Sequence, residues 1–356
     1  MNAIIKDNDH LTNKILIDWF AMTTNLSQPE DIIKMLGMES IPFELTYGCR
    51  GWRKRLYFDG VSIHFEGHDG LIWLEMSGQG CRAFETFGHG DFNVLFDFVL
   101  GNPDNCNITR LDVAYDDYIG LLDLDKIVYD SLNGNFVSKA RVGDLSTNTC
   151  IVEQGINRNV GRCVTHGTKR SSVIIRIYDK AAERNKSDEI PHWVRCEIML
   201  RRERAFEFIK LLRPSDEHTW SDEVKDYVSV RPAETIDNLY FMVLNHYLRY
   251  INKSNTDSNK WRAPMADHWE KFALSITDEK KSLYVNPCVE YNALNLSNYV
   301  SDRNAGPIFT YINLFGVDDL VERVNEKAPI NLNPKYKMLL AEDAELKRKD
   351  VNIERR

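Results

Sequence analysis

The sequence predicts an α+β fold in which a duplicated α/β unit forms a largely antiparallel sheet with helices on one face, followed by a helical C-terminal region. Short runs of alternating or β-branched apolar residues, typical of strands, recur between residues 14 and 200. Residues 75–85 (EMSGQGCRAFE) and 197–207 (EIMLRRERAFE) also align without a gap and share Glu, Arg, Ala, Phe and Glu. Each segment lies where a strand passes into a helix, which indicates two copies of one unit.

The first copy spans about residues 14–100. Apolar alternation predicts strands at residues 14–24, in two runs within 43–58, at 61–66 and at 71–76. A helix begins at Asp31, behind Pro29, with acidic residues in its first turn, where they complement the helix dipole. The Gly-rich turn SGQGCR then leads into the apolar helix FNVLFDFVLG. This turn lacks the lysine and the spacing of a nucleotide-binding P-loop.

The second copy spans about residues 107–212. Strands are expected at residues 108–115 (ITRLDVAY), 171–180 (SSVIIRIYDK) and 193–200 (WVRCEIML), with a hairpin excursion between residues 134 and 167. The expected helices of this copy are LDLDKIVYDSL, AAERNK and RRERAFEFIKLL. Beyond it, helical periodicity marks residues 234–251, 266–276 and 306–324. We therefore expect one domain at residues 1–212 and a helical region at residues 213–356.

Composition limits the class of protein. With 43% hydrophobic and 28% charged residues, the chain has the composition of a soluble globular protein. The net charge of −8 excludes a generally basic surface, so nucleic-acid binding requires local basic clusters. The seven cysteines contain no C-x-x-C pair, which argues against a zinc site or a disulfide framework. No signal-peptide pattern and no apolar run of about 20 residues is present. We expect a cytoplasmic protein without a membrane partner.

The strand at residues 171–180 contains the candidate nucleophile. Alternation places Arg176 and Tyr178 on one face of the strand, and Lys180 follows two residues later. A tyrosine hydroxyl between cations is placed as a phenolate attacking a phosphate would need to be. A core tyrosine with a hydrogen-bonded hydroxyl is the alternative.

Two carboxylates are candidate metal ligands. Asp112 lies inside an apolar strand, where a carboxylate is costly unless it is paired or bound to a metal. Glu197 alternates with apolar residues in a later strand. The duplicated sheet would bring Asp112 and Glu197 to the face that carries Tyr178. Carboxylates on adjacent strands form a hard oxygen site for Mg²⁺ or Mn²⁺. The alternative is a pair of structural ion pairs with Arg110 and Arg195.

Basic residues suggest where DNA would bind. The segment CRGWRKRLYF interleaves cations with aromatic residues, a pattern that suits phosphates with stacked bases but also suits a solvated hairpin. Further cations lie beside the Gly-rich turn, before the strand of Tyr178 and on the strand of Glu197. The candidate DNA-binding residues are Arg50, Trp52, Arg53, Lys54, Arg55, Arg82, Lys169, Arg170 and Arg195.

Five ordered segments resemble one known family. IDWFAMTT, LEMSGQGCRAFE, TRLDVAYDD, IRIYDKAAE and WVRCEIML, within residues 14–212, are similar to the replication initiation factor family. That family includes rolling-circle plasmid initiators, filamentous-phage replication proteins and relaxases of integrative elements. The resemblance implies a rolling-circle nuclease-like fold and a metal-dependent, strand-specific nicking and closing of origin DNA through a 5′-phosphotyrosyl intermediate.

The resemblance also assigns roles to individual residues. The nucleophile falls on Tyr178, with Arg176 and Lys180 beside it, and the metal carboxylates fall on Asp112 and Glu197. The His-hydrophobic-His pair of better-known rolling-circle nucleases is absent from the sequence. His64, Glu75 and Asp117 remain candidates for a third ligand, and Tyr115 or Tyr118 for a second tyrosine. Chain length and the lack of an N-terminal helix-turn-helix extension favour a phage or prophage initiator over a plasmid initiator or an integrative-element relaxase.

Two other functions remain open at the level of sequence. A regulator would bind DNA without chemistry, and a metal-dependent hydrolase would cleave it without needing Tyr178. The expected partner is origin DNA, single-stranded or extruded at the nick site. The C-terminal region is open to three roles, which are packing on the catalytic sheet, binding the origin duplex and recruiting a host helicase. Homodimer formation is likewise open.

Overall fold

The computed structural model describes most of the chain. The described residues are 11–146, 150–153, 156–159, 161–221, 225–253, 259–277, 279–280, 283, 296–297, 300, 304–329, 332 and 340–341. The expected helical C-terminal region therefore lies partly outside the described residues. The chain divides into two compact units, Met1–Val285 and Asn286–Arg356.

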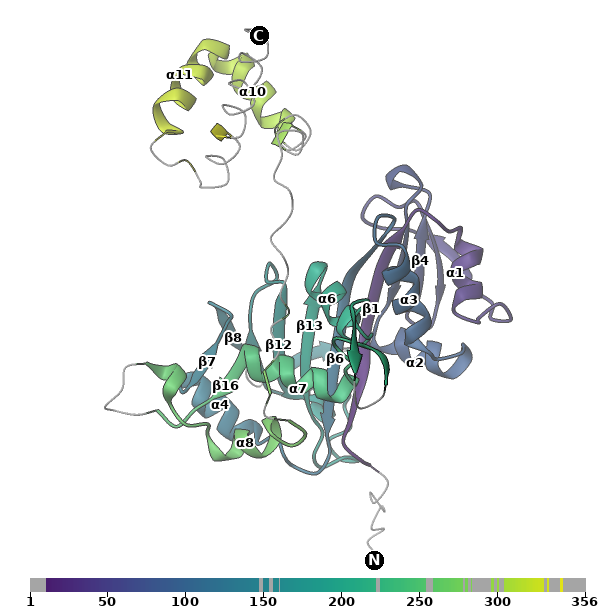
Figure 1. Cartoon of the computed structure of the whole chain (residues 1–356), viewed down its shortest axis with the longest axis vertical. Coiled ribbons are helices and arrows are strands. Elements are labelled where there is room, and N and C mark those ends of the chain that lie inside the picture. The colour runs from purple at the N-terminus through teal and green to yellow at the C-terminus, as the bar shows by residue number, and fades with distance from the viewer. Residues whose placement is uncertain are drawn as a thin grey trace, which may run out of the picture. The chain divides into compact units, whose positions relative to one another are not determined.

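A large sheet organises the first unit (Figure 1). Among the described residues ten strands form it, and every pairing between them is antiparallel, as the sequence predicts. The strands lie in the order β2 (Glu44–Tyr47), β3 (Lys54–Phe58), β4 (Val61–Phe65), β5 (Ile72–Met76), β1 (Lys14–Thr24), β6 (Cys106–Asp117), β13 (Val194–Arg201), β12 (Val173–Asp179), β11 (Cys163–His166) and β8 (Gly143–Ser146).

The order of the strands confirms the duplication. Outward from the middle, one half of the sheet reads β1, β5, β4, β3, β2 and the other reads β6, β13, β12, β11, β8. In each half, the strand that comes first in the sequence lies at the middle of the sheet. The strand that comes last in the sequence pairs directly with it. The two halves join where β1 pairs with β6. Glu75 and Glu197, the first residues of the repeated segments, occupy equivalent positions because they face Ala21 and Ala114 of the central strands.

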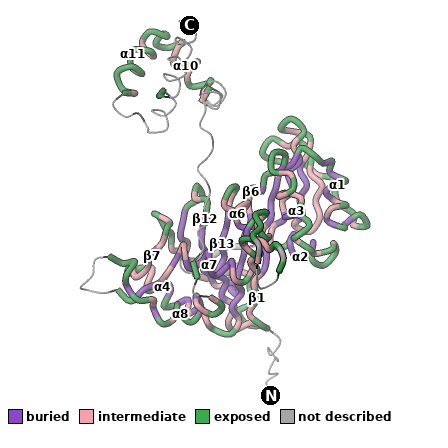
Figure 2. Tube along the Cα trace, in the orientation of Figure 1, coloured by how far each residue is buried: buried purple, intermediate pink, exposed green. Residues whose placement is uncertain are grey.

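Helices pack on one face of this sheet and build one core, visible as buried purple segments in Figure 2. Alternate strand residues such as Leu111, Val113, Ile175 and Ile177 supply the sheet side of this core. The helices that contribute buried side chains are α1 (Pro29–Met35), α2 (Gly78–Phe87), α3 (Phe92–Gly101), α4 (Leu124–Leu132), α6 (Glu203–Leu211), α7 (Ile236–Tyr247) and α8 (Asp267–Ala273). The other face, called the open face below, carries the intervening residues of the same strands.

Short elements complete the first unit. They are α5 (Lys180–Glu183), the hairpins β9 (Cys150–Glu153) with β10 (Ile156–Asn159) and β14 (His218–Ser221) with β15 (Asp226–Ser229), and the pair β7 (Phe136–Ser138) with β16 (Leu248–Tyr250). None of the described helices combines the length and the apolarity that a membrane span requires.

Three elements differ from the sequence prediction. The Gly-rich segment begins the separate helix α2, whose Ser77 side chain accepts a hydrogen bond from the Gly80 amide. The expected helix at residues 234–251 ends at Tyr247, because its last residues pair as β16 with β7. The expected helix at 306–324 is two helices, α10 (Ala305–Phe315) and α11 (Val317–Lys327), separated by Gly316 at a φ of 88°.

The structure also divides the chain elsewhere than at the expected boundary after residue 212. Residues 213–285 belong to the same compact unit as the sheet. The reason is α7, which is buried along Leu239–Asn245 rather than along one stripe. Its Tyr240 hydroxyl donates a hydrogen bond to the Cys196 carbonyl oxygen of β13 at 2.8 Å. Three roles were left open for the C-terminal region, and the structure shows one of them, packing on the sheet, for residues 213–285.

Backbone contact between α2 and the β3–β4 turn gives a test of this packing. A Cβ atom at Gly80 would lie 2.2 Å from the Gly60 carbonyl oxygen and 2.5 Å from its carbonyl carbon. We expect Gly80→Ala to destabilise the protein by about 1–3 kcal/mol, because backbone must move to admit the methyl group. Gly101, at the end of α3, has no atom within 4 Å of its Cβ position. Gly101→Ala is therefore the matched control, expected to be neutral or stabilising by up to about 1 kcal/mol. Urea unfolding followed by circular dichroism measures both, and equal stabilities would contradict the packing.

Candidate active site

Three adjacent strands bring the predicted active-site residues together on the open face. β12 pairs with β13 so that Arg176 faces Glu197 and Tyr178 faces Arg195. β13 pairs in turn with β6, which carries Asp112. Period-two alternation explains this placement, because the neighbouring residues Ile175, Ile177, Cys196 and Ile198 all enter the core.

The Tyr178 hydroxyl lies between a carboxylate and an ammonium group. It donates a hydrogen bond to Glu197 Oε2 at 3.1 Å and accepts one from Lys180 Nζ at 3.4 Å. The Arg176 guanidinium lies 4.9 Å from the centre of the Tyr178 ring, and its Nη1 is 3.5 Å from Glu197 Oε1. Tyr178 is only 5% exposed. The hydroxyl therefore lies beside Lys180 as expected, but its second partner is the Glu197 carboxylate rather than a second cation.

Electrostatics keep this tyrosine neutral in the structure. Burial, and then the charge of Glu197, raise the pKa of Tyr178 well above its usual value. Burial also lowers the pKa of Lys180, whose ammonium pairs with Glu183 at 2.6 Å. The phenol is thus held as a hydrogen-bond donor to a carboxylate that can accept its proton.

Asp112 and Glu197 are buried and repel each other. Burial, and then the charge of Glu197, raise the pKa of Asp112. The Arg110 guanidinium contacts both Asp112 oxygens, with its Nη2 2.5 Å from Oδ2 and its Nε 2.9 Å from Oδ1. Of the two structural pairs considered from the sequence, the one between Arg110 and Asp112 is therefore present. Glu197 pairs with Arg176 instead of Arg195.

Arg195 has a structural position rather than the DNA-binding one expected from the sequence. It is 3% exposed, and its Nε and Nη2 donate to the two oxygens of Asp116 at 2.7 and 2.8 Å. Its Nη1 lies 2.5 Å from Asp18 Oδ2. The guanidinium is thus committed to two carboxylates rather than to a phosphate.

Asp18 and Asp116 are the site residues that sequence reasoning missed. Asp18 sits where the pairing of β1 with β6 shifts register between Ile17 and Trp19, so it is the extra residue of a β-bulge. A bulge places two successive residues on one face, which brings Asp18 to the open face beside Trp19. The signal was available, because Asp18 interrupts an apolar strand just as Asp112 does.

The three candidates for a third metal ligand lie away from this pair. His64 is on β4 and Glu75 on β5, three and two strands from β6, or about 14 and 10 Å at the usual strand spacing. Asp117 accepts hydrogen bonds from His192 Nε2 and from the Leu122 amide. Within the part of the chain that the structure describes, no group of three or more His, Cys, Asp or Glu side chains is arranged to hold a metal.

A cavity of about 510 Å³ opens beside the site. Lys180, Arg195 and Asp18 line it together with the start of α2, including Arg82. Arg82 Nη2 donates to the Ile17 carbonyl oxygen at 2.8 Å and contacts Glu85. Tyr118 also lines this cavity, whereas Tyr115 points into the core on the other face. Of the two further tyrosines, only Tyr118 adjoins the site.

The remaining predicted DNA-binding residues form two separate groups. One lies in and before the β3 hairpin, where Arg50, Arg53 and Lys54 are exposed and Arg55 is half-buried against Thr46. Lys54 pairs with Glu66 at 2.5 Å. The other group is Lys169 and Arg170, which are exposed in the turn before β12. Trp52 is half-buried, and its Nε1 donates to the Leu71 carbonyl oxygen at 2.8 Å.

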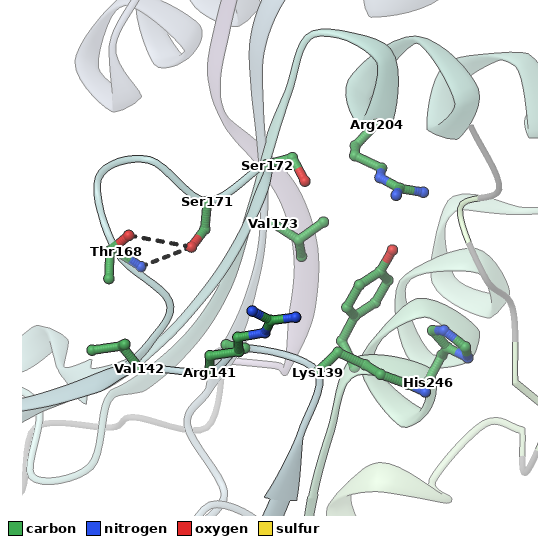
Figure 3. A pocket seen from close by; sticks show the side chains of 11 residues that line it. Lys139, Arg141, Val142, Thr168, Ser171, Ser172, Val173, Arg204 and His246 are labelled. Atoms are coloured by element: carbon green, nitrogen blue, oxygen red, sulfur yellow. Dashed lines mark hydrogen bonds between the residues drawn. The ribbon is translucent and has the colours of Figure 1, made fainter. Parts of the chain in front are cut away.

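Besides these two groups, basic residues line a cavity of about 490 Å³ beside the start of β12, which we call the basic cavity (Figure 3). Lys139, Arg141, Arg204 and His246 line it, and no carboxylate is among the described residues around it. Figure 3 shows the Arg141 and Arg204 guanidinium groups reaching toward the same space. Such a lining suits an anionic group such as a phosphate.

Two family models match the chain. The family model described as "Replication initiation factor" matches residues 106–323, more than half of the chain. The chain belongs to the replication initiation factor family. A model described as the N-terminal domain of rolling-circle replication initiation proteins matches residues 14–100, the range expected for the first copy.

Two individual proteins illustrate the relationship. The putative DNA relaxase NicK of Bacillus subtilis (strain 168) is 25% identical over 253 residues, which cover 68% of this chain and 65% of NicK. The chain therefore spans less than two thirds of that relative. A rolling-circle replication initiator protein from Geobacillus stearothermophilus has a solved structure that is 23% identical, with a TM-score of 0.59. It covers 77% of this chain and 100% of its own, and the likeness shows the shared fold.

The buried Arg195 network yields a stability prediction for this replication initiation factor. We expect Arg195→Leu to destabilise the protein by about 3–5 kcal/mol, because Asp116 and Asp18 would be left as buried carboxylates without their cation. Arg184 is an exposed arginine near the same site. Arg184→Leu serves as the control and should change stability by less than about 0.5 kcal/mol. Chemical denaturation compares the two, and a mild effect of Arg195→Leu would show that the network contributes little.

Proposed function

We propose that this protein nicks one strand of DNA by direct attack of Tyr178 on a phosphodiester, holds the 5′ end as a phosphotyrosine, and later rejoins it. The observation that carries the proposal is the buried Tyr178 hydroxyl, which lies 3.1 Å from Glu197 and 3.4 Å from Lys180. A core tyrosine would need one hydrogen-bond partner, whereas this one has a proton acceptor on one side and a cation on the other.

The residues divide the chemical step between them. Glu197 takes the phenolic proton as the Tyr178 oxygen forms its bond to phosphorus. The bond from phosphorus to the 3′ oxygen breaks, and that oxygen leaves as a hydroxyl after taking a proton from solvent. Arg176 and Lys180 stabilise the phenolate and the negative charge on the phosphoryl oxygens. One phosphodiester replaces another, so the energy needed for rejoining is retained.

The donor set around Asp112 and Glu197 fits a divalent cation. Burial, and then the charge of Glu197, raise the pKa of the Asp112 carboxyl, so the two buried carboxylates act on each other. Mg²⁺ is commonly held by one or two carboxylates together with substrate phosphate and water, so a third protein ligand is not required. Asp112 and Glu197 would hold Mg²⁺ or Mn²⁺, with Arg110 yielding part of its contact with Asp112. When bound, the ion would neutralise charge on the scissile phosphate.

The relatives support DNA as the substrate. One is named a DNA relaxase and the other a rolling-circle replication initiator. The exposed cations Arg50, Arg53, Lys169 and Arg170 would bind backbone phosphates, because such contacts supply most of the affinity for DNA. The basic cavity offers a further place for a phosphate.

The nucleophile can be tested with a covalent adduct. Single-stranded oligonucleotides tiled across the DNA that flanks the gene are incubated with the protein and Mg²⁺ or Mn²⁺, then run on a denaturing protein gel. We expect a shifted protein–DNA band that disappears in Tyr178→Phe and persists in Tyr129→Phe, which changes an exposed tyrosine on α4.

Two outcomes would redirect the proposal. Cleavage by Tyr178→Phe without an adduct would mean that water is the nucleophile and the protein is a hydrolase. Binding without cleavage by the unmodified protein would indicate a regulator that keeps the fold without the chemistry.

The metal site can be tested without measuring activity. Mn²⁺ at about 100 times its dissociation constant should stabilise the protein by about 2.7 kcal/mol, because it binds only the folded state. Asp112→Asn should lose most of this stabilisation, whereas Asp125→Asn, at an exposed carboxylate, should retain it. Thermal unfolding with and without Mn²⁺ reports both. An undiminished shift in Asp112→Asn would remove Asp112 from the ligand set.

A further inference from the structure

A further cavity, distinct from the two described above, lies on the open face in the N-terminal half of the sheet and has a volume of about 490 Å³. Its volume lies within the range of about 300–1,000 Å³ typical of ligand pockets. Three of the seven tryptophans of the chain, Trp19, Trp52 and Trp73, line it, and we call it the tryptophan pocket. The Trp52 and Trp73 ring centres are 5.1 Å apart, and His64 stacks on Trp73 at 4.4 Å. The walls are therefore flat aromatic surfaces held by further rings.

Polar groups in the tryptophan pocket lack partners. The Trp19 Nε1 atom is buried without a hydrogen-bond acceptor. Among the described residues, no hydrogen bond or ion pair reaches the Glu75 carboxylate, which also lines the pocket. Buried donors are normally satisfied, so the Trp19 Nε1 atom is available to a ligand, and the half-buried Glu75 carboxylate offers an acceptor in the same pocket. A donor and an acceptor in one pocket match the edge of a nucleobase, which carries both.

Arginines surround these rings and connect the pocket to the active site. The Arg50 guanidinium lies 5.2 Å from the centre of Trp73, and that of Arg110 lies 3.9 Å from the centre of Trp19. Arg110 also holds Asp112, so one side chain borders both the tryptophan pocket and the proposed metal site. Cations beside stacking surfaces are the arrangement that proteins use for single-stranded nucleic acids.

The duplication explains why this pocket mirrors the active site. Glu75 occupies the position of Glu197, and it faces Ser62 on β4 as Glu197 faces Arg176 on β12. By the same register His64 stands where Tyr178 stands, and Trp73 where Arg195 stands. The N-terminal copy thus has aromatic side chains at the positions where the C-terminal copy has its charged network.

Building on the proposed nicking function, we propose that the tryptophan pocket binds one unstacked nucleobase of the strand that Tyr178 cleaves. The aromatic walls would stack on the base, Glu75 and Trp19 would hydrogen-bond its edge, and Arg50 and Arg110 would contact the adjoining phosphates. β5 and β12 are separated by β1, β6 and β13, about 19 Å at the usual strand spacing. The bound base therefore belongs to a nucleotide a short way along the strand from the scissile phosphate. Paired bases in a duplex cannot enter, which ties the pocket to single-stranded DNA.

The test separates the contribution of bases from that of phosphates. Fluorescence anisotropy measures binding of the full chain to three labelled 12-nucleotide probes, which are oligo-dA, oligo-dC and an abasic chain with the same phosphates. Stacking of one base strengthens binding by about 5- to 160-fold. We expect the unmodified protein to bind both base-bearing probes at least about tenfold more tightly than the abasic probe. Trp52→Ala should abolish most of this ratio while keeping affinity for the abasic probe.

Matched variants keep the test decisive. Tyr47→Ala removes a 93% exposed aromatic side chain on β2 and should leave the ratio unchanged. Glu75→Ala should reduce the ratio by about threefold or more, and it provides the answer if Trp52→Ala does not fold. A ratio near one in the unmodified protein, or an unchanged ratio in both pocket variants, would overturn the proposal. Nicking is scored separately by the covalent-adduct assay, so a protein that fails to nick can still show base binding by the pocket, and a protein that nicks can still lack it.

Discussion

Burial of charge on one face of the central strands is the constraint on which the rest of the site depends. The apolar residues of β6, β12 and β13 that pack into the core alternate with charged residues, which therefore lie on the other face of the sheet. These charges persist at low exposure because each has an opposite partner, with Arg195 between Asp116 and Asp18 as the most enclosed case. Removing one member leaves another buried and unpaired, which makes the network cooperative.

The same network sets the state of Tyr178, the proposed nucleophile. Because Arg195 is committed to Asp116 and Asp18, Glu197 is left to Arg176 and the Tyr178 hydroxyl. The tyrosine is therefore held as a neutral donor, and its orientation is fixed before any DNA arrives.

Sequence reasoning predicted the sheet and the shared face of Asp112, Tyr178 and Glu197 from period-two alternation, and the duplication from the aligned segments 75–85 and 197–207. It missed what depends on pairing between distant strands. Asp18 is recognisable as a carboxylate in an apolar strand, but the bulge that brings it to the open face depends on the pairing of β1 with β6. The choice of Asp116 as the partner of Arg195 likewise depends on strand register. Similarly, residues 248–250 read as helix but pair with β7, because a strand partner more than a hundred residues away outweighs local propensity.

The two copies carry different side chains at equivalent positions, and this difference bears on the direction in which a DNA strand would lie across the open face. A face built from two matching halves would present the same surface to a chain that enters from either end. Here the position of Tyr178 is taken by His64 in the other copy, and that of Arg195 by Trp73. A DNA strand has chemically distinct ends, so the two ways of laying it across this face are no longer equivalent. The divergence of the copies thus turns a nearly symmetric scaffold into one with a polarity.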